Sequence, residues 1–444
     1  MSISNLRVLG LSALLTVLAG CGSSSGGSAI SAPPIAGCSI AEQNTFVFDL
    51  MNDIYFWIDD VPAVTNVGFS SPEEVLQAFL FEPLDRFSGL RDLEENTAFF
   101  SNSQFIGLGL SFKVVDENRL RLAQVFGDGA AAAAGLARGD ELIRIDGRDV
   151  SDIIAANELG TAFGASEEGV TVTLDYIDAM GSTLQAQLTK GLVTIETVTL
   201  TTEFDVAGRT VGYLAFRNFV EPSFDALADA FAQLNAAGVE SLILDLRYNG
   251  GGLVDVAEQL GSLIGGAQVV GETFARRVHN ANNASRDFDA LFSTEPNALS
   301  ITDLVVITTG STASASELVI NSLIPFIPVT VVGEASFGKP VGAYQFEFCD
   351  KVAVPTAFAS VNALGDGDFF DGFVPDCPAA DDLDRALGDP MEASLAEALF
   401  VVQNGSCSPV SGLRATSTKR SRDRDVARKV GQSLNEFDLE RNAF

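Results

Sequence analysis

The chain has 444 residues, of which 47% are hydrophobic, and this is enough apolar material for two or three domains with cores of their own. Its 59 acidic and 27 basic side chains give a formal charge of −32 at pH 7. So acidic a surface repels phosphate backbones and anionic lipids, which excludes nucleic acids and anionic membrane surfaces as expected partners.

The N-terminus has the layout of a cleaved targeting segment. Arg7 precedes an apolar run over residues 8–18, which is too short to span a bilayer and is typical of a signal peptide. The run ends in Leu-Ala-Gly-Cys at Cys21, which resembles a bacterial lipoprotein cleavage box, with a plain secretory site as the alternative. We expect a signal peptide over residues 1–20, a lipid on Cys21 as the only membrane contact, and a flexible tether over residues 21–37. This predicts a lipid-anchored protein of the bacterial cell envelope that faces the periplasm.

Two helices are predicted in the segment that follows the tether. Apolar residues recur at helical spacing between Ala41 and Trp57. Ser-Pro-Glu-Glu at residues 71–74 has the cap and the first-turn proline of a second helix. Residues 38–100 are therefore expected to form a small helical N-terminal region.

A β-rich module is predicted over residues 101–195. Residues 133–147 resemble the signature of a PDZ domain, in which a helix ends, a turn forms at Gly-Asp and a strand runs into an Asp-Gly turn. PDZ domains bind a peptide C-terminus by adding it as a strand beside a sheet edge, with backbone N–H groups around the terminal carboxylate. The resemblance places the carboxylate-binding loop, just ahead of a strand, at Gly107, Leu108, Gly109 and Leu110. A generic β module is the alternative.

Strand and helix patterns alternate over residues 196–405, which indicates an α/β core. A helix that begins at Ser223 leads to the strand-like run Leu242–Arg247, and Tyr-Asn-Gly-Gly-Gly follows at residues 248–252. Glycines after a strand let backbone N–H groups approach a ligand closely, as an oxyanion hole requires. An ordinary tight turn has the same composition.

The most informative segment for chemistry is Gly-Ser-Thr-Ala-Ser-Ala-Ser-Glu at residues 310–317, which lies between a strand-like run and a helical pattern. A serine hydroxyl needs a base to act as a nucleophile, and the chain has one histidine, His279, for a Ser-His-Asp triad. Phe-Gly-Lys-Pro at residues 337–340 offers the other common base, a lysine kept neutral by burial. For the serine segment alone, a helix cap without chemistry is the alternative.

These three segments, in this order, resemble the motifs of the C-terminal processing peptidases, also called tail-specific proteases. The resemblance covers roughly Phe105 to Gln345. It implies an α/β fold with a crotonase/ClpP-like core, an inserted PDZ domain and a small helical N-terminal region. It also implies a serine endopeptidase that cuts proteins near their C-termini, so the expected partners are proteins or peptides bound through those C-termini.

The resemblance assigns the catalytic roles residue by residue. Ser314 is the nucleophile and Lys339, 25 residues later, is the general base, while Ser311 and Ser316 are the competing serines. The backbone N–H groups of Gly252 and Ala315 are assigned as the oxyanion donors. Glu317 corresponds to a glutamate of the family's active-site surroundings.

The lysine loop departs from the family pattern at two positions. The family continues Gly-Lys-Gly-x-x-Gln, whereas this chain has Pro340 after the lysine and Ala343 where the glutamine is expected. Gln345 lies two residues further, on the same face of a strand, and is the candidate replacement. Because of this departure, a catalytically inactive PDZ scaffold stays an alternative function. An apolar-ligand-binding protein on the same core fold is the other alternative, against which the presence of both Ser314 and Lys339 argues.

With Cys21 lipidated, four cysteines remain, and an even count outside the cytoplasm predicts disulfides. Among the three pairings that four cysteines allow, we expect Cys349–Cys377 and Cys38–Cys407, because the second bridge would join the two ends of the folded body. No cysteine pair has zinc-finger spacing, so neither a metal nor a cofactor is expected. The polar, partly basic tail over residues 406–444 is expected to be disordered or loosely docked on the acidic body.

Overall fold

The computed structural model describes residues 32–116 and 118–409. The expected signal peptide, the lipidation site Cys21 and the tail beyond residue 409 lie outside the described residues. Within the described ranges, no helix is long and apolar enough to cross a membrane.

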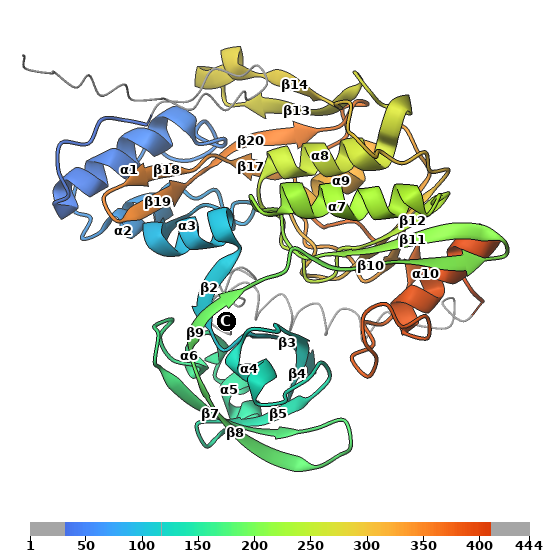
Figure 1. The fold of residues 1–444 in the computed structure, drawn as a ribbon. Coiled ribbons are helices and arrows are strands. Elements are labelled where there is room, and N and C mark those ends of the chain that lie inside the picture. Colours follow the sequence, from blue (N-terminus) through green and yellow to red (C-terminus); the bar gives the residue numbers. More distant parts are fainter. Residues whose placement is uncertain (1–31, 117, 410–444) are drawn as a thin grey trace, which may run out of the picture.

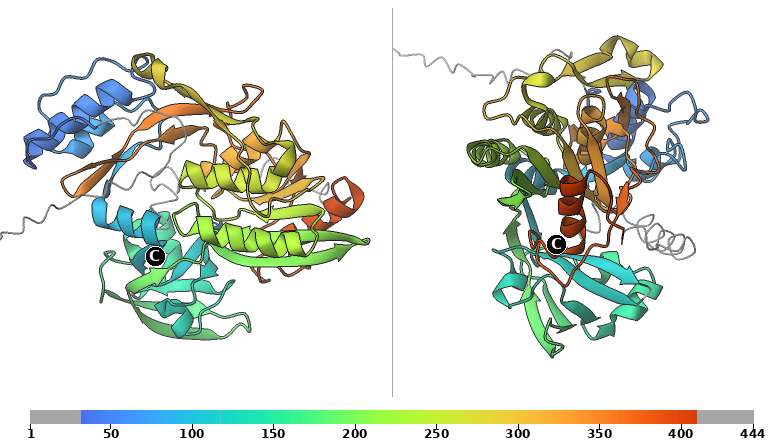
Figure 2. Two further views of the ribbon diagram at one scale, coloured as in Figure 1. Left: turned by 45° about the horizontal axis from the view of Figure 1, so that its top comes forward. Right: turned by 90° about the vertical axis from the view of Figure 1, so that its right-hand side faces the viewer.

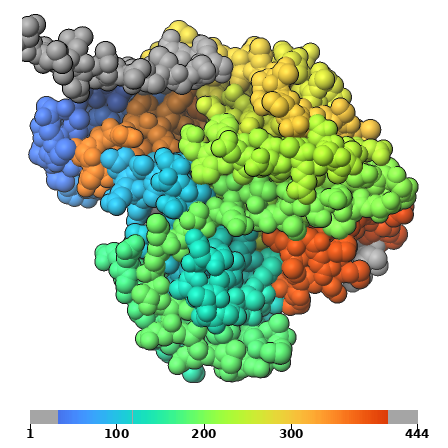
Figure 3. Space-filling model, in the orientation of Figure 1, coloured from blue at the N-terminus to red at the C-terminus, as the bar shows by residue number. Residues whose placement is uncertain are grey.

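The molecule has two lobes that are joined by a pair of strands (Figure 1). The smaller lobe has a hydrophobic core of its own, formed by residues between 108 and 188. The joining strands, β2 (Gln104–Gly107) and β9 (Gly191–Thr194), pair antiparallel. The turned views in Figure 2 and the space-filling view in Figure 3 show the same separation, with the C-terminal part of the large lobe against the side of the small one.

A six-stranded sheet is the centre of the large lobe. Its order is β10-β11-β12-β15-β16-β21, with β10 antiparallel to β11 and the other neighbours parallel. The strands are β10 (Val198–Val206), β11 (Arg209–Phe216), β12 (Ser241–Asp245), β15 (Leu304–Thr308), β16 (Val329–Gly333) and β21 (Cys377–Pro378).

Helices cover both faces of this sheet because its inner strands are apolar on both sides. In β12, Leu242 and Leu244 pack in one core, while Ile243 packs in the core on the opposite face. The helices on the first face are α7 (Ser223–Ala236), α8 (Val254–Gly265) and α9 (Ala315–Leu323), and α10 (Ala393–Asn404) lies on the second. The α/β core predicted from the sequence is confirmed.

A second, antiparallel sheet packs beside α9 and has the order β14-β13-β20-β17. Two short 3₁₀ helices flank β13 along the chain. These elements are β13 (Thr273–His279), β14 (Phe288–Leu291), β17 (Val341–Ala343), β20 (Thr356–Val361), η1 (Gly266–Gln268) and η2 (Ala281–Arg286).

The N-terminal region contains the two predicted helices, but a late part of the chain completes it. Strand β1 pairs with β19, which in turn pairs with β18, and helices α1 and α2 share a core with this small sheet. The elements are α1 (Ile40–Ile54), α2 (Pro72–Gln77), β1 (Gly89–Asp92), α3 (Leu93–Asn102), β18 (Phe346–Phe348) and β19 (Lys351–Val354). The region is thus not helical alone.

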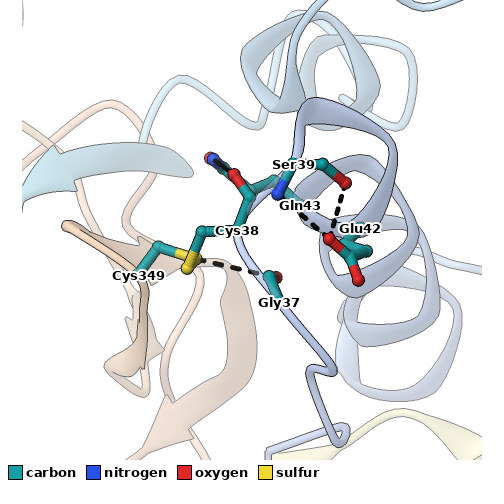
Figure 4. Close-up of a disulfide and its surroundings, with 6 residues drawn as sticks. All are labelled: Gly37, Cys38, Ser39, Glu42, Gln43 and Cys349. Carbon is teal, nitrogen blue, oxygen red and sulfur yellow. Dashed lines mark hydrogen bonds between the residues drawn. A yellow bond between two sulfur atoms is a disulfide. The ribbon is translucent and has the colours of Figure 1, made fainter.

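The described residues contain two disulfides, and the expected pairing is wrong. Cys38 pairs with Cys349, as Figure 4 shows, and Cys377 pairs with Cys407. The expectation of Cys349–Cys377 and Cys38–Cys407 assumed that the two ends of the folded body meet. Each bridge instead joins a terminal segment to the layer against which that segment packs.

The packing around the first bridge gives the physical reason for this pairing. Helix α1 begins directly after Cys38, and its Phe46 stacks on Phe348 with 4.6 Å between ring centroids, next to Cys349. The helix start is capped by Ser39, whose N–H and hydroxyl both donate to Glu42 Oε2, at 3.0 and 2.6 Å (Figure 4). The second bridge similarly follows α10, which packs on the central sheet beside β21.

The small lobe is built on a sheet with the order β3-β4-β5-β7-β8, in which β3 is an edge strand and β6 pairs with β5. Three short helices complete it. The elements are β3 (Leu110–Asp116), β4 (Arg119–Val125), α4 (Ala130–Ala133), β5 (Glu141–Ile145), β6 (Arg148–Asp149), α5 (Val150–Ala155), α6 (Leu159–Ala162), β7 (Thr171–Ile177) and β8 (Thr183–Thr189).

Asp381 is the centre of the polar contact between the two lobes. Its carboxylate accepts from Lys113 at 3.1 Å and Arg138 at 3.0 Å on the small lobe, and from Arg247 at 3.3 Å and the Tyr248 hydroxyl at 2.7 Å on the large lobe. Burial opposes ionisation, but these cations outweigh it and hold the pKa of Asp381 well below its ordinary value. The contact fixes the small lobe beside the glycine turn.

Candidate active site

Ser314 lies at the point where the turn after β15 becomes helix α9. Its φ of 55° and ψ of −115° belong to a region that non-glycine residues rarely adopt. The turn is held in place because the Thr312 hydroxyl donates to Leu246 O at 2.8 Å and the Ala313 N–H donates to Asn249 O at 3.1 Å. The helix start predicted for Ser314 is confirmed, and its backbone is of the strained kind that clusters at functional sites.

Of the three candidate serines, Ser314 lines the pocket that also contains Lys339. Ser316 is fully buried and its hydroxyl donates to Asn249 O at 2.9 Å, so it is committed to the fold. Ser311 does not line that pocket. Of the three, Ser314 is therefore the serine that shares a pocket with Lys339, and its assignment as nucleophile stays a prediction.

The glycine turn lies directly against Ser314. At Gly251, which has a φ of +96°, an added Cβ would be 2.8 Å from both Ser314 Cβ and Ala315 N, so only glycine fits. Gly252 has a φ of +140° and lies against Phe219, whose O would be 2.0 Å from an added Cβ. In the described part of the chain, the N–H groups of Gly252 and Ala315 donate no hydrogen bond to protein. Both expected oxyanion donors are thus free to bind a ligand.

Lys339 is half-buried, and its ammonium has an unusual environment. Nζ lies 5.3 Å from the ring centroid of Phe87, and within the described residues it has neither a hydrogen bond nor an ion pair. Burial, followed by the positive charge of Arg91, lowers the pKa of Lys339 to about 8, whereas Asp85 and Glu317 act in the opposite direction. A lysine with this pKa supplies a neutral amine near neutral pH.

Glu317 connects the nucleophile turn to the lysine loop. Its carboxylate is fully buried, and its Oε2 accepts from the N–H groups of Ser314 at 3.0 Å and Lys339 at 2.8 Å. Its Oε1 accepts from the Ser336 hydroxyl at 2.5 Å and the Gly338 N–H at 2.7 Å. Burial raises the pKa of Glu317, and these four donors oppose the rise. Glu317 is therefore a positioning residue that spans both halves of the site.

Sequence reasoning missed Arg86. Its guanidinium donates to Phe337 O at 2.9 Å, Gly338 O at 3.2 Å and Phe370 O at 3.4 Å, and lies 4.6 Å from the centroid of the Phe337 ring. The lysine loop is thus held through its N–H groups by Glu317 and through its carbonyl groups by Arg86. No local pattern could have identified a contact between positions about 250 residues apart.

Gln345 is not brought to the catalytic pair. It is exposed, and its Oε1 accepts from Asn96 Nδ2 at 2.7 Å. Asn96 Oδ1 accepts in turn from Arg91 Nη1 at 3.3 Å. The supporting role expected for Gln345 stays a prediction. Through Asn96 it is linked to Arg91, whose positive charge adds to the effect of burial in lowering the pKa of Lys339.

The pocket that contains the hydroxyl and the amine is otherwise mostly apolar. Beyond Ser314 and Lys339, its walls are formed by Val254, Ala315, Leu318, Pro340, Val341, Gly342, Phe358, Ser360 and Phe369. His279 is outside it, and its ring nitrogens contact Asp287 Oδ1 at 3.1 Å and the Tyr344 hydroxyl at 3.0 Å. The arrangement offers a serine nucleophile with an amine base for acyl transfer.

The predicted carboxylate-binding loop precedes the edge strand β3. All four residues of the loop are buried, and the carbonyl groups of Leu108 and Gly109 accept from the N–H groups of Ala131 at 2.9 Å and Phe126 at 2.8 Å. Gly109 has a φ of +78°, and an added Cβ would be 2.5 Å from Gly129 Cα. The loop beginning at Gly107 is therefore tightly packed against the segment before α4.

Comparisons with known proteins identify the family that this chain resembles. Residues 210–378 match the family described as Peptidase family S41, and residues 42–89 match the Peptidase S41 N-terminal domain. The chain is similar to the chloroplastic C-terminal processing peptidase of Tetradesmus obliquus, with 31% identity over 60% of this chain and 57% of the relative. It is also similar to the carboxyl-terminal-processing protease of Synechocystis sp., with 29% identity over 66% of each chain. The chain thus spans between about half and two thirds of the curated relatives that it matches.

Solved structures show the same fold. A putative S41 protease from Bacteroides fragilis superposes with a TM-score of 0.65 and 21% identity, over 81% of this chain and 97% of that one. The photosystem II D1 C-terminal processing protease superposes with a TM-score of 0.51 and 20% identity, over 83% of this chain and 98% of that one. At these identities the likeness concerns the fold alone, and it confirms the mixed α/β architecture.

Proposed function

The chain belongs to peptidase family S41, and on this basis we propose that it is a serine endopeptidase with a Ser314–Lys339 dyad. One observation carries the proposal: these side chains line the same pocket, and the pKa of the lysine is lowered to about 8. A serine without a base is a weak nucleophile, and a lysine with its ordinary pKa is a poor base at neutral pH. The shared pocket and the lowered pKa therefore support a dyad in which Lys339 activates Ser314.

In the proposed reaction, the neutral amine of Lys339 takes the proton of the Ser314 hydroxyl while the oxygen attacks a peptide carbonyl carbon. The N–H groups of Gly252 and Ala315 stabilise the oxyanion, and the N-terminus of α9 adds the positive end of its dipole. The peptide C–N bond breaks, and the Lys339 ammonium returns the proton to the leaving amine. Water, deprotonated by Lys339, then hydrolyses the acyl-enzyme and regenerates Ser314.

The selection of substrate belongs to the small lobe in this proposal. We take this lobe to be a PDZ domain, inserted beside a crotonase/ClpP-like core, that binds the substrate C-terminus. The support is a glycine-containing loop at 107–110 directly ahead of β3, whose outer edge is unpaired in its sheet. The enzyme would then cut proteins near the C-termini that this lobe holds.

The location of the enzyme is proposed from the sequence. The lipoprotein-like ending at Cys21 supports a lipid anchor and a periplasm-facing place in the bacterial cell envelope. The two disulfides of the folded body are consistent with an oxidising compartment.

The test of the proposed function is loss of peptidase activity in Ser314→Ala, with Ser311→Ala as the matched control. Removing the nucleophile of a cooperating catalytic group costs on the order of 10⁶ in rate, whereas the control should retain activity. Cleavage of an unfolded protein substrate is measured, with circular dichroism to verify folding. A Ser314→Ala protein as active as the parent would move the nucleophile elsewhere. A folded but inactive parent would favour the scaffold or the apolar-ligand-binding alternative.

A further inference from the structure

A second, larger pocket lies behind the segment that carries the catalytic lysine. It has a volume of about 490 Å³, within the range of small-ligand sites, and shares Pro340 and Val341 with the catalytic pocket. Along β20, Phe358 and Ser360 line the catalytic pocket, whereas the alternate residues of the strand line the second one. Because successive side chains of a strand point to opposite faces, the two pockets lie on opposite faces of the β17–β20 pair.

Three aromatic rings form the apolar part of the second pocket. Phe56 and Trp57 come from the segment after α1, and Phe370 comes from the loop after β20. The rings are contiguous, with centroid distances of 5.2 Å between Phe56 and Trp57 and 6.2 Å between Trp57 and Phe370. Aromatic faces attract cations as well as apolar groups, and Trp does so most strongly.

Two carboxylates complete the pocket. Asp366 and Asp368 line it, both are exposed, and within the described residues neither carboxylate has an ion pair or a hydrogen bond. Their loop is held in one conformation: Asn362 Oδ1 accepts from the Asp366 N–H at 3.0 Å, and Asn321 Nδ2 of α9 donates to Asp366 O at 2.8 Å. The backbone at Asp366 is therefore held in place, and neither carboxylate is paired with a cation among the described residues.

We propose that this pocket binds an arginine or lysine side chain of the polypeptide substrate, so that the enzyme favours chains with a basic residue near the cleavage point. This inference rests on the proposed function. An apolar stem over aromatic rings with a cationic end at two free carboxylates matches the pocket in both shape and charge. Strand β17 is an edge of its sheet, so an extended chain that crosses this edge reaches both pockets.

A binding experiment tests the chemistry of the pocket directly. Trp57 is the only tryptophan of the chain, so its fluorescence reports on this pocket. The Ser314→Ala protein is titrated with Nα-acetyl-arginine amide and with Nα-acetyl-citrulline amide, which is a neutral isostere. We expect a saturable change with the arginine probe and binding about tenfold weaker with citrulline. The preference should vanish in an Asp366→Asn/Asp368→Asn variant and persist in Asp371→Asn, an exposed neighbour that does not line the pocket.

A cleavage experiment tests whether the occupant belongs to the substrate. A neutral reference peptide is compared with a set in which arginine or citrulline replaces one residue at a time on either side of the scissile bond. At one position arginine should raise kcat/KM about tenfold over citrulline, and the double variant should reduce this ratio to below about twofold while cleaving the reference peptide normally. Equal rates for both series in the parent, or a preference retained by the double variant, would overturn the inference.

The outcomes separate this inference from the proposed function. Cleavage of the neutral peptide that depends on Ser314, without any preference for arginine, would refute the basic-residue pocket and leave the peptidase intact. Binding of the arginine probe without a cleavage preference would show that the pocket takes a free cation, and this too would overturn the assignment to the substrate.

Discussion

Burial and, after it, the charge of Arg91 should determine the pH at which the enzyme becomes active, because both lower the pKa of Lys339. Arg91 lowers the pKa of Lys339, so replacing it by glutamine should raise that pKa. With a pKa of about 8, the fraction of neutral lysine is about 1% at pH 6, about 10% at pH 7 and one half at pH 8. The kcat/KM of the parent should therefore rise about tenfold from pH 6 to pH 7 and level off above about pH 9.

The variant should show the same rise at higher pH. Each unit by which the pKa of Lys339 increases lowers the activity of Arg91→Gln at pH 7 about tenfold, while activity on the high-pH plateau changes little. The assay is kcat/KM against pH for one peptide. Arg144→Gln is the matched control, because it removes the same charge from an exposed pair with Asp149 on the small lobe. If the rise of kcat/KM with pH occurs at the same or at a lower pH in Arg91→Gln than in the parent, the electrostatic reasoning is refuted.

Three further changes test other parts of the site. In Glu317→Gln, the amide NH₂ group faces two of the four donors whichever way the side chain is turned, so the change should lower the free energy of unfolding by about 2–6 kcal/mol and also lower kcat. Denaturant unfolding and a peptidase assay measure the two effects, and a variant with unchanged stability and activity would contradict the positioning role. Lys339→Met should abolish activity yet stabilise the fold by roughly 1 kcal/mol at pH 7. This gain should shrink as the pH rises from about 8 toward 10.5, because the lowered pKa of Lys339 in the folded state costs stability only where the lysine of the unfolded chain is still protonated. Amidation of a substrate's C-terminus should slow its cleavage about tenfold if the loop at 107–110 binds the carboxylate, and equal rates for acid and amide would remove the tail selection.

The loop at 107–110 leaves no room for a larger residue that would block it. A bulky residue at Gly109 would collide with the backbone of Gly129 and would perturb the whole small lobe. Changing the substrate leaves the protein intact, so the comparison isolates the carboxylate.

The candidate catalytic residues could be proposed from the sequence because short local motifs point to them. The strand and turn before Ser314, the helix after it and the glycines at 250–252 each have a composition that specifies local backbone geometry. The glycine turn and Ser314 lie side by side because β12 and β15 are parallel neighbours and the chain leaves both strands at the same edge of the sheet. The sequence alone was therefore sufficient to propose Ser314 and Lys339 as the candidate pair, and their catalytic roles stay a prediction.

The contacts that tune these residues were not predictable. Arg86 and Arg91 precede the lysine loop by about 250 residues, and their segment reaches it only because β1 pairs with β19. The same packing decides the disulfides: cysteine spacing leaves three pairings open, and Cys38 meets Cys349 because α1 packs on the strands beside it. Sequence determined the elements and the reactive groups, since these depend on neighbours along the chain. Only the tertiary structure decided the pKa of Lys339, the anchoring of its loop and the cysteine pairing, since these depend on burial and on charges that distant segments bring together.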